Sequence, residues 1–272
     1  MVDNRSSATP LIDADKARRV CDRNRGVGGD GVIFALPPTA PSTDFSMRVF
    51  NSDGSEPEMC GNGIRCLAHF VAAADRQTGE RTYRVDTAAG LIQPQILEDG
   101  RVRVDMGRPE LDGPKVPTTL SSSRADGAVV QAPLDVDGKV WRVTCVSMGN
   151  PHAVVFANDQ DGEFQVADLD LARLGPQFEC NAAFPARVNT EFVQVKSPSL
   201  VKMRVWERGA GPTLACGTGA CAIVVAGVLE NRLDRTCRVE LPGGDLDIEW
   251  AADGHVYMTG PAVAVFEGEL LI

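Results

Sequence analysis

Apolar residues recur at spacings of three and four along several stretches of the chain, which is the periodicity of an amphipathic helix. Between these stretches lie short apolar or alternating runs bounded by Gly, Pro, Asn and Asp, which favour strands. Helices are predicted over residues 13–25, from residue 64 to about 79, near 169–174 and around 223–228. Strands are predicted at 32–36, 47–51, 83–85, 91–96, 102–106, 139–148, 153–156, 191–195, 200–205, 238–241, 247–250, 256–258 and 262–266.

The order of these elements repeats. In each half, strands lead to a Cys-Gly-x-Gly turn, then to a central apolar helix, then to further strands. A helix that is apolar over most of its circumference belongs inside, wrapped by sheet. The pattern therefore predicts an α+β fold of two pseudo-symmetric domains with an active site in the cleft between them. The Pro-, Thr- and Ser-rich stretch 113–127 is a plausible junction, which gives domains at 1–112, completed by a C-terminal strand at about 260–272, and at 113–259.

Composition excludes several classes of function. The 272 residues carry a formal net charge of −10, which argues against sequence-independent binding to nucleic acid. No apolar run approaches the length of a membrane span, and the first residues lack the apolar core of a secretory signal, so a cytoplasmic protein is expected. The eight cysteines fit reduced thiols better than a disulfide framework, and their spacings do not favour a metal site.

Two cysteines occur in nearly the same setting, Met59-Cys60-Gly61-Asn62-Gly63 and Ala215-Cys216-Gly217-Thr218-Gly219. Each leads directly into an apolar helix, so each thiol is predicted at a helix N-terminus, where free N–H groups and the helix dipole favour a thiolate. Inverting a stereocentre with an acidic C–H needs a base on one face and a proton donor on the other. One thiolate and one thiol can supply both, and the N–H groups can bind the substrate carboxylate.

Each motif also has a plainer interpretation. A cysteine is often a small buried hydrophobe, but packing alone seldom places a thiol at the same point of two repeats. Cys66 and Cys221, on the helices that follow, are expected in the core. The run Gly26-Val27-Gly28-Gly29-Asp30-Gly31 matches the dinucleotide fingerprint, yet it follows a predicted helix and precedes a strand, the reverse of the required order, so it is interpreted as a turn.

Other polar groups stand beside predicted strand ends. Asn51 and Glu207 each lie nine residues before the cysteine of their Cys-Gly-x-Gly turn. This equivalent position makes both residues candidate substrate ligands or thiol modulators. His152, in the turn Gly149-Asn150-Pro151-His152, is the preferred site residue among the three histidines. Taken singly, each group is ordinary turn chemistry.

Taken together, these segments resemble those of the diaminopimelate epimerase family. The matching segments run along nearly the whole chain in family order and are specific together, although each alone is weak. They are 26–31, Phe50-Asn51-Ser52-Asp53-Gly54-Ser55-Glu56, 59–66, Met148-Gly149-Asn150-Pro151-His152, Glu207-Arg208-Gly209-Ala210-Gly211 and 215–221.

The resemblance implies a cofactor-independent, metal-free two-base epimerisation between LL- and meso-diaminopimelate on the route to lysine, with Cys60 and Cys216 as catalytic residues. Gly61, Asn62, Gly217 and Thr218 would hold the reacting end of the substrate, and Asn51, Asn150, Asn189, Glu207 and Arg208 would read the distal end. His152 and Glu207 would also tune the thiols. A homodimer is implied through the C-terminal region, where Phe266 stands in place of the usual tyrosine.

The chain differs from the family pattern at its start. Family members begin with a strand and a Gly-Asn-Asp-Phe segment whose Asn contacts substrate, whereas here Met1-Val2-Asp3 matches the tail of that strand. Either the start was placed too far downstream, or the domain lacks a strand and one substrate ligand. In the second case an exposed sheet edge and weaker activity are expected. Two alternatives stay open: a proline or hydroxyproline racemase, which usually carries His where Asn62 stands, and a weakly active or non-catalytic ligand-binding relative.

Overall fold

The computed structural model describes residues 1–57, 60–157 and 165–271, which form two compact units. The first unit comprises residues 1–105 and 259–272, and the second comprises residues 106–258. The division into domains at 1–112 and 113–259 stays a prediction. Among the described residues, no helix is long and apolar enough to cross a membrane.

The described residues of the first unit form two helices and eight strands. A five-stranded sheet has the order β1-β2-β3-β5-β6, in which β2 and β3 are antiparallel, while β1 runs parallel to β2 and β3 parallel to β5. Strand β7 pairs with both β4 and β8. The elements are β1 (Val2–Asp3), α1 (Ala14–Cys21), β2 (Gly31–Leu36), β3 (Phe45–Asn51), α2 (Gly61–Ala74), β4 (Arg81–Thr82), β5 (Val85–Thr87), β6 (Gly90–Ile92), β7 (Gln95–Ile96) and β8 (Val102–Asp105).

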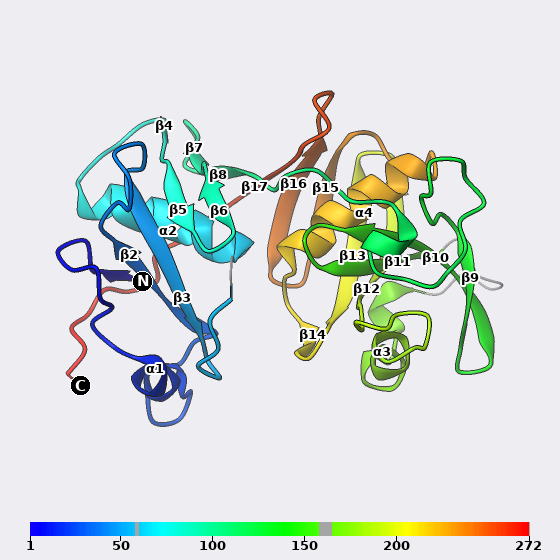
Figure 1. Cartoon of the computed structure of the whole chain (residues 1–272), viewed down its shortest axis with the longest axis horizontal. Coiled ribbons are helices and arrows are strands. Elements are labelled where there is room, and N and C mark those ends of the chain that lie inside the picture. Colours follow the sequence, from blue (N-terminus) through cyan, green and yellow to red (C-terminus); the bar gives the residue numbers. More distant parts are fainter. Residues whose placement is uncertain (58–59, 158–164, 272) are drawn as a thin grey trace. The chain divides into compact units, whose positions relative to one another are not determined.

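Helix α2 buries the face that the sequence predicts. Ile64, Leu67, Ala68 and Val71 are at most 1% exposed, and the helix lies against β2, β7 and β8 (Figure 1). Helix α1 is shorter than predicted and ends at Cys21, before the glycine-rich turn. That turn lies between a helix and a strand, as the order of elements predicts.

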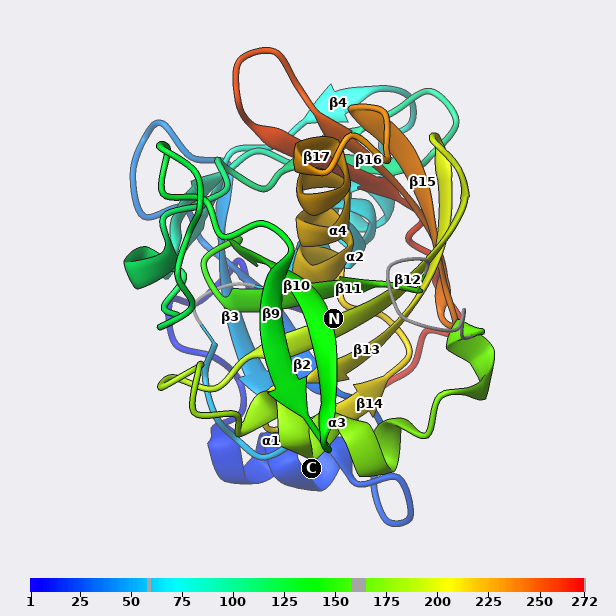
Figure 2. The same ribbon diagram turned by 90° about the vertical axis from the view of Figure 1, so that its right-hand side faces the viewer.

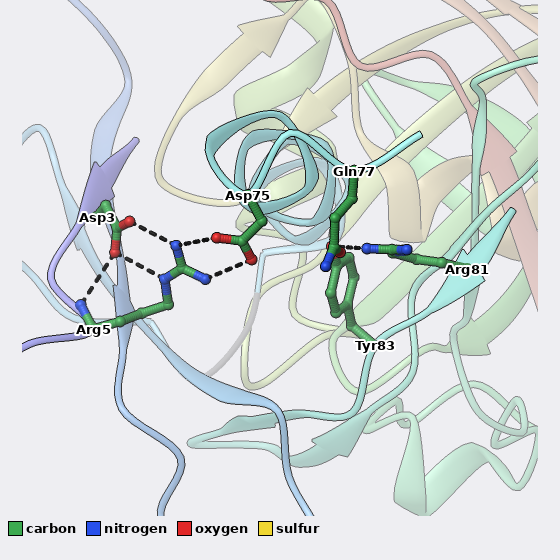
Figure 3. A network of polar contacts seen from close by, with 6 residues as sticks. All are labelled: Asp3, Arg5, Asp75, Gln77, Arg81 and Tyr83. Atoms are coloured by element: carbon green, nitrogen blue, oxygen red, sulfur yellow. Dashed lines mark hydrogen bonds and ion pairs between the residues drawn. The ribbon is translucent and has the colours of Figure 1, made fainter. Parts of the chain in front are cut away.

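The start of the chain is tied to the end of α2 by a charged network (Figure 3). The Arg5 guanidinium donates to Asp3 on its own segment and to both carboxylate oxygens of Asp75, the C-cap of α2, at 2.8 Å each. Next to it, Tyr83 joins Gln77 and Arg81 through contacts of 3.4 Å. Strand β1 pairs with β2 at two positions, opposite Phe34 and Ala35, so the sheet anchors only a short segment. The ion pairs of Arg5 give this segment a second anchor.

The second unit is a larger sheet around a buried helix. Its strand order is β17-β16-β15-β13-β12-β11-β10-β9, with β14 paired to β13. The elements are η1 (Gly113–Lys115), β9 (Ala132–Val136), β10 (Lys139–Ser147), β11 (Pro151–Phe156), η3 (Val166–Asp168), α3 (Leu171–Glu179), β12 (Asn189–Ser197), β13 (Leu200–Glu207), β14 (Gly211–Thr213), α4 (Gly217–Leu229), β15 (Thr236–Leu241), β16 (Gly244–Trp250) and β17 (Val256–Gly260).

Helix α4 is the centre of this unit. Every residue from 219 to 227 is buried, and the helix packs against strands β10, β11, β12, β15 and β16 (Figure 2). This confirms the prediction of an apolar helix wrapped by sheet. The strands packed against α4 therefore hold its first turn, which carries Cys216, in the core of the unit.

Helix α3 covers a second core on the same unit. Phe178 of α3 meets Trp141 and Phe192 edge to face, with ring centroids 5.4 and 5.3 Å apart. At Gly175 an added Cβ would lie only 2.1 Å from Cδ2 of Trp206, so the indole rests directly on the helix backbone. The sequence predicts a helix only near 169–174, and α3 continues beyond it to Glu179.

The C-terminal segment corrects one prediction. A strand is expected at 262–266 and, more broadly, at about 260–272, but residues 261–271 have no regular secondary structure. Val263, Val265 and Phe266 are between 72% and 88% exposed. Within the described part of the chain, no neighbouring strand pairs with this segment.

Candidate active site

Both cysteines of the repeated turns cap central helices with nearly the same backbone. Cys60 is the N-cap of α2 with φ −135° and ψ 107°, and Cys216 is the N-cap of α4 with φ −129° and ψ 106°. The prediction that each thiol lies at a helix start is therefore confirmed. Residue 59 of the first turn lies outside the described residues.

The Cys60 thiol interacts with its own helix. Its Sγ accepts from the backbone N–H of Gly63 at 3.3 Å, and the side chain is partly exposed. A Cβ at Gly63 would lie 2.3 Å from Cδ1 of Ile33 and 3.1 Å from Sγ, so glycine is needed for this close approach. Oδ1 of Asn62 is buried without a hydrogen-bond partner, which marks it as an acceptor available to a ligand.

The Cys216 thiol lies in a different environment. The residue is 5% exposed, and Sγ is 3.5 Å from Oγ1 of Thr218. Burial raises the pKa of this thiol well above its ordinary value, and the carboxylates of Glu207 and Glu191 raise it further, whereas contacts with Thr218 and the Gly219 N–H lower it. In the free protein Cys216 is therefore held as the thiol.

A buried polar cluster adjoins the second turn. The ring of His152 on β11 is fully buried, with Nδ1 2.7 Å from Oε1 of Glu191 and Nε2 2.9 Å from Oδ1 of Asn150. Glu191, on β12, is also fully buried. Desolvation raises the pKa of the Glu191 carboxyl above its ordinary value, although His152 opposes this shift.

Asn189 links the ends of two segments that carry predicted site residues. Its amide donates to the carbonyl of Pro151 at 2.9 Å, and its Oδ1 accepts from the backbone N–H of Arg208 at 2.8 Å. The Arg208 side chain is exposed and donates to the carbonyl of Ala186 at 3.0 Å. The Asn189 amide thus orients the loop that begins after β13.

A second buried carboxylate holds the same loop. Oε2 of Glu179 accepts from the Trp206 indole at 2.7 Å, and Oε1 accepts from the Gly209 N–H at 2.9 Å and from Arg187 at 3.1 Å. Glu207 lies between these anchors and accepts from the hydroxyl of Thr213. The positions of Glu207 and Arg208 are therefore set by residues on α3 and β12.

Asn51 ends β3 in the first unit. Its side-chain amide donates to Oγ of Ser55 at 3.0 Å, and its backbone N–H donates to the Ser55 carbonyl at 2.8 Å. Because Asp53 also accepts from Ser55, the turn 51–55 is held by its own hydrogen bonds.

The predicted site residues divide between the units. Asn51, Cys60, Gly61 and Asn62 belong to the first unit, and the remaining eight belong to the second. In the second unit, strand pairing sets His152 opposite Asn189, although 37 positions separate them in sequence. Neither Glu191 nor Glu179 is among the site residues predicted from the sequence. A carboxylate at the start of the apolar run Glu191-Phe192-Val193 is the signal that could have revealed Glu191.

This arrangement supports proton transfer at carbon. Each unit presents one thiol at the N-terminus of a helix of 13 or 14 residues, and such termini offer free N–H groups and a positive dipole end to an anion. Each unit therefore combines a group that can move a proton with a place for a carboxylate.

Comparison with known proteins gives a consistent result. The family model described as diaminopimelate epimerase matches residues 1–111 and 144–265. A chloroplastic diaminopimelate epimerase of Oryza sativa subsp. japonica is 59% identical over 98% of this chain and 75% of its own length. A diaminopimelate epimerase of Synechocystis is 57% identical over 99% of this chain and 93% of its own.

Solved structures show the same fold at low identity. A phenazine biosynthesis protein of the PhzF family from Bacillus anthracis is 18% identical, with a TM-score of 0.65 over 96% of this chain and 90% of that one. A hydroxyproline epimerase from Agrobacterium vitis is 15% identical, with a TM-score of 0.55 over 94% and 83%. These likenesses bear on the fold alone, and they confirm the predicted α+β architecture.

Proposed function

The chain belongs to the diaminopimelate epimerase family; it is an isomerase that interconverts LL- and meso-diaminopimelate, and we propose that Cys60 and Cys216 are its two proton-transfer residues. The observation that carries this proposal is the matched pair of cysteine N-caps, one in each unit. The small-molecule substrate and the place in lysine biosynthesis follow from the family.

The proposed reaction is a balanced transfer of one proton off and one proton on. A thiolate takes the α-proton and becomes a thiol, while the C–H electron pair spreads into the adjacent carboxylate. The opposite thiol then gives its proton to the other face of the carbon and becomes a thiolate. Because burial, the largest cause of its raised pKa, keeps Cys216 protonated, the resting enzyme has Cys216 as the acid.

The reacting end of the substrate is proposed to bind at the two helix starts. Backbone N–H groups of Gly61, Asn62, Gly217 and Thr218 would receive its carboxylate and the charge that develops there. The unpartnered Oδ1 of Asn62 supports a role for this residue as an acceptor for the α-ammonium group.

The distal end is proposed to meet Asn51, Asn150, Asn189, Glu207 and Arg208. An exposed guanidinium can bind a carboxylate through two parallel hydrogen bonds, which suits Arg208 to the second carboxylate of diaminopimelate. The bonds from Asn189 and Glu179 to this loop support a preset geometry. His152 and Glu207 are proposed to tune the thiols.

The function is tested by following LL-diaminopimelate and proline in parallel. Formation of the meso isomer from LL-diaminopimelate, with proline unchanged, is the expected result. Cys60→Ser and Cys216→Ser should each lower turnover by about 100- to 10,000-fold, the range of general acid–base catalysis. Full activity of either variant would contradict the role of that thiol, and racemisation of proline alone would select the racemase.

The compartment and assembly are also proposed. A chain with eight cysteines and no sequence signature of a disulfide framework suits the reducing cytoplasm. A net charge of −10 disfavours binding to nucleic acid or to an anionic membrane surface. The exposed apolar side chains of Val263, Val265 and Phe266 support a second copy of this chain as the partner. Sedimentation of the wild type and of Phe266→Asp tests this: the expected dimer should weaken in the variant, and a monomeric wild type would contradict it.

A further inference from the structure

Glu191 is a buried carboxyl that the proposed proton transfer does not use. It lies on β12, and the parallel strand β11 beside it carries His152 (Figure 2). Both side chains are fully buried, with Oε1 and Nδ1 2.7 Å apart. Oε2 of Glu191 is buried without a hydrogen-bond partner. A buried acceptor without a donor is unusual and calls for an explanation in terms of function.

The orientation of the Asn150 amide indicates how protons are shared in this cluster. Oδ1 of Asn150 only accepts, so the Nε2 atom that faces it carries a proton. In a neutral imidazole the other nitrogen, Nδ1, would then be an acceptor, and an ionised carboxylate could not bond to it. One further proton must therefore lie between Glu191 and Nδ1, which makes the buried pair neutral overall, as an acid and an imidazole or as a carboxylate and an imidazolium.

The pair lies directly beside the first turn of α4. A Cβ at Gly219 would be 2.6 Å from Oε1 of Glu191, so the carboxyl packs against the turn that Cys216 begins. Besides burial, the charge of Glu207 on β13 also raises the pKa values of Cys216 and Glu191. The strands β10, β15 and β16 contribute apolar side chains to the same core, among them Val146, Val239 and Ile248.

We propose that Glu191 is a positioning residue for the reaction: it shares one proton with His152, holds the imidazole with Nε2–H on Asn150, and sets the pH at which Cys216 ionises. This proposal rests on the role proposed for Cys216. At neutral pH the cluster adds no net charge beside the thiol. When the shared proton leaves, the cluster becomes an anion and opposes formation of the Cys216 thiolate.

The test measures Cys216 itself rather than turnover. Iodoacetamide alkylation of Cys216, followed by peptide mass spectrometry across a pH series, gives the midpoint of its ionisation. Glu191→Gln keeps the size and a hydrogen bond but removes the charge, so the midpoint should fall by about one pH unit, the scale of one nearby charge in a partly screened site. The pH profile of kcat should shift in the same direction with KM unchanged.

Glu230→Gln is the matched control. Glu230 caps the other end of α4 and accepts from Thr144, Arg232 and Gln131, and its side chain is 2% exposed. This variant removes a buried carboxylate from the same helix, so it should leave the Cys216 midpoint in place. An unmoved midpoint in Glu191→Gln, or an equal shift in Glu230→Gln, would overturn the proposal.

A second measurement needs no variant at Glu191. The chain has three histidines, so nitrogen-15 NMR of the wild type, with His69→Gln and His255→Gln for assignment, can identify His152. A protonated Nε2 at neutral pH is expected. An unprotonated Nε2 would overturn the proton assignment even if Glu191→Gln fails to fold. Failure of the proposed function would instead appear as loss of isomerisation in the wild type, with these two readouts unaffected.

Discussion

Replacing Gly175 by alanine should destabilise the second unit, although alanine is the better helix former. Gly175 lies inside α3, where Gly-to-Ala exchange alone would stabilise by about 1 kcal/mol. The new Cβ, however, would lie 2.1–2.4 Å from Cδ2, Cε3 and Cγ of Trp206. These atoms belong to a rigid ring that cannot bend aside, so the indole must leave the helix surface.

The magnitude follows from what that movement disrupts. Overpacking a filled site costs about 1–3 kcal/mol. Loss of the 2.7 Å bond from the indole N–H to the buried Glu179 carboxylate costs about 1.5–3 kcal/mol. After subtracting the propensity gain, the free energy of unfolding should fall by about 1.5–5 kcal/mol. Because Trp206 precedes Glu207 and Arg208, KM for diaminopimelate should also rise.

Urea unfolding followed by tryptophan fluorescence measures the effect. Ala172→Gly is the control, since residue 172 is exposed on the same helix and its change should cost only the propensity, about 1 kcal/mol. If Gly175→Ala stabilises the protein, or costs less than the control, the packing of Trp206 on α3 is not what the structure indicates.

Three further predictions concern charge. Arg208→Lys should raise KM for diaminopimelate by about 10-fold with little change in kcat, because an ammonium cannot form the bidentate contact; an unchanged KM in steady-state assays would argue against that contact. The pKa of the Cys216 thiol is raised, so the folded protein keeps this proton above pH 9, where the unfolded chain loses it. The free energy of unfolding should therefore fall as the pH rises further. Urea titrations at a series of pH values should show a smaller fall in Cys216→Ala. Arg5→Ala should cost about 1 kcal/mol or less, because its ion pairs with Asp3 and Asp75 are partly exposed; a large drop in melting temperature would show that the N-terminal network contributes more.

The local features of the fold were predictable from sequence, because their causes lie within a few residues. The two Cys-Gly-x-Gly turns and the apolar periodicity after them locate both central helices, and the reversed order of elements around 26–31 identifies a turn. A helix is predicted near 169–174, but α3 continues to Glu179, because a proline such as Pro176 normally ends a helix and here lies inside one. The candidate strand at 262–266 was wrong because a strand requires a partner, which local alternation does not supply.

The candidate site was predictable only where residues are close in sequence to the cysteines. The importance of Glu191 depends on the pairing of β11 with β12, which brings it to His152 across 39 positions of sequence. Likewise, Glu179 matters because α3 packs under the loop that carries Arg208. Such long-range contacts arise from topology, so no spacing rule in the sequence reveals them.

The central claim is that two different thiols serve the two faces of one carbon, and isotope exchange in deuterium oxide tests it most directly. LL-diaminopimelate is converted to a small extent, and the deuterium content of both epimers is read by mass spectrometry after they are separated. With two residues, the meso product gains solvent deuterium at the inverted carbon, while recovered LL substrate stays protiated in the first turnovers. Deuterium that enters recovered substrate as fast as product would show a single base serving both faces and would contradict the account.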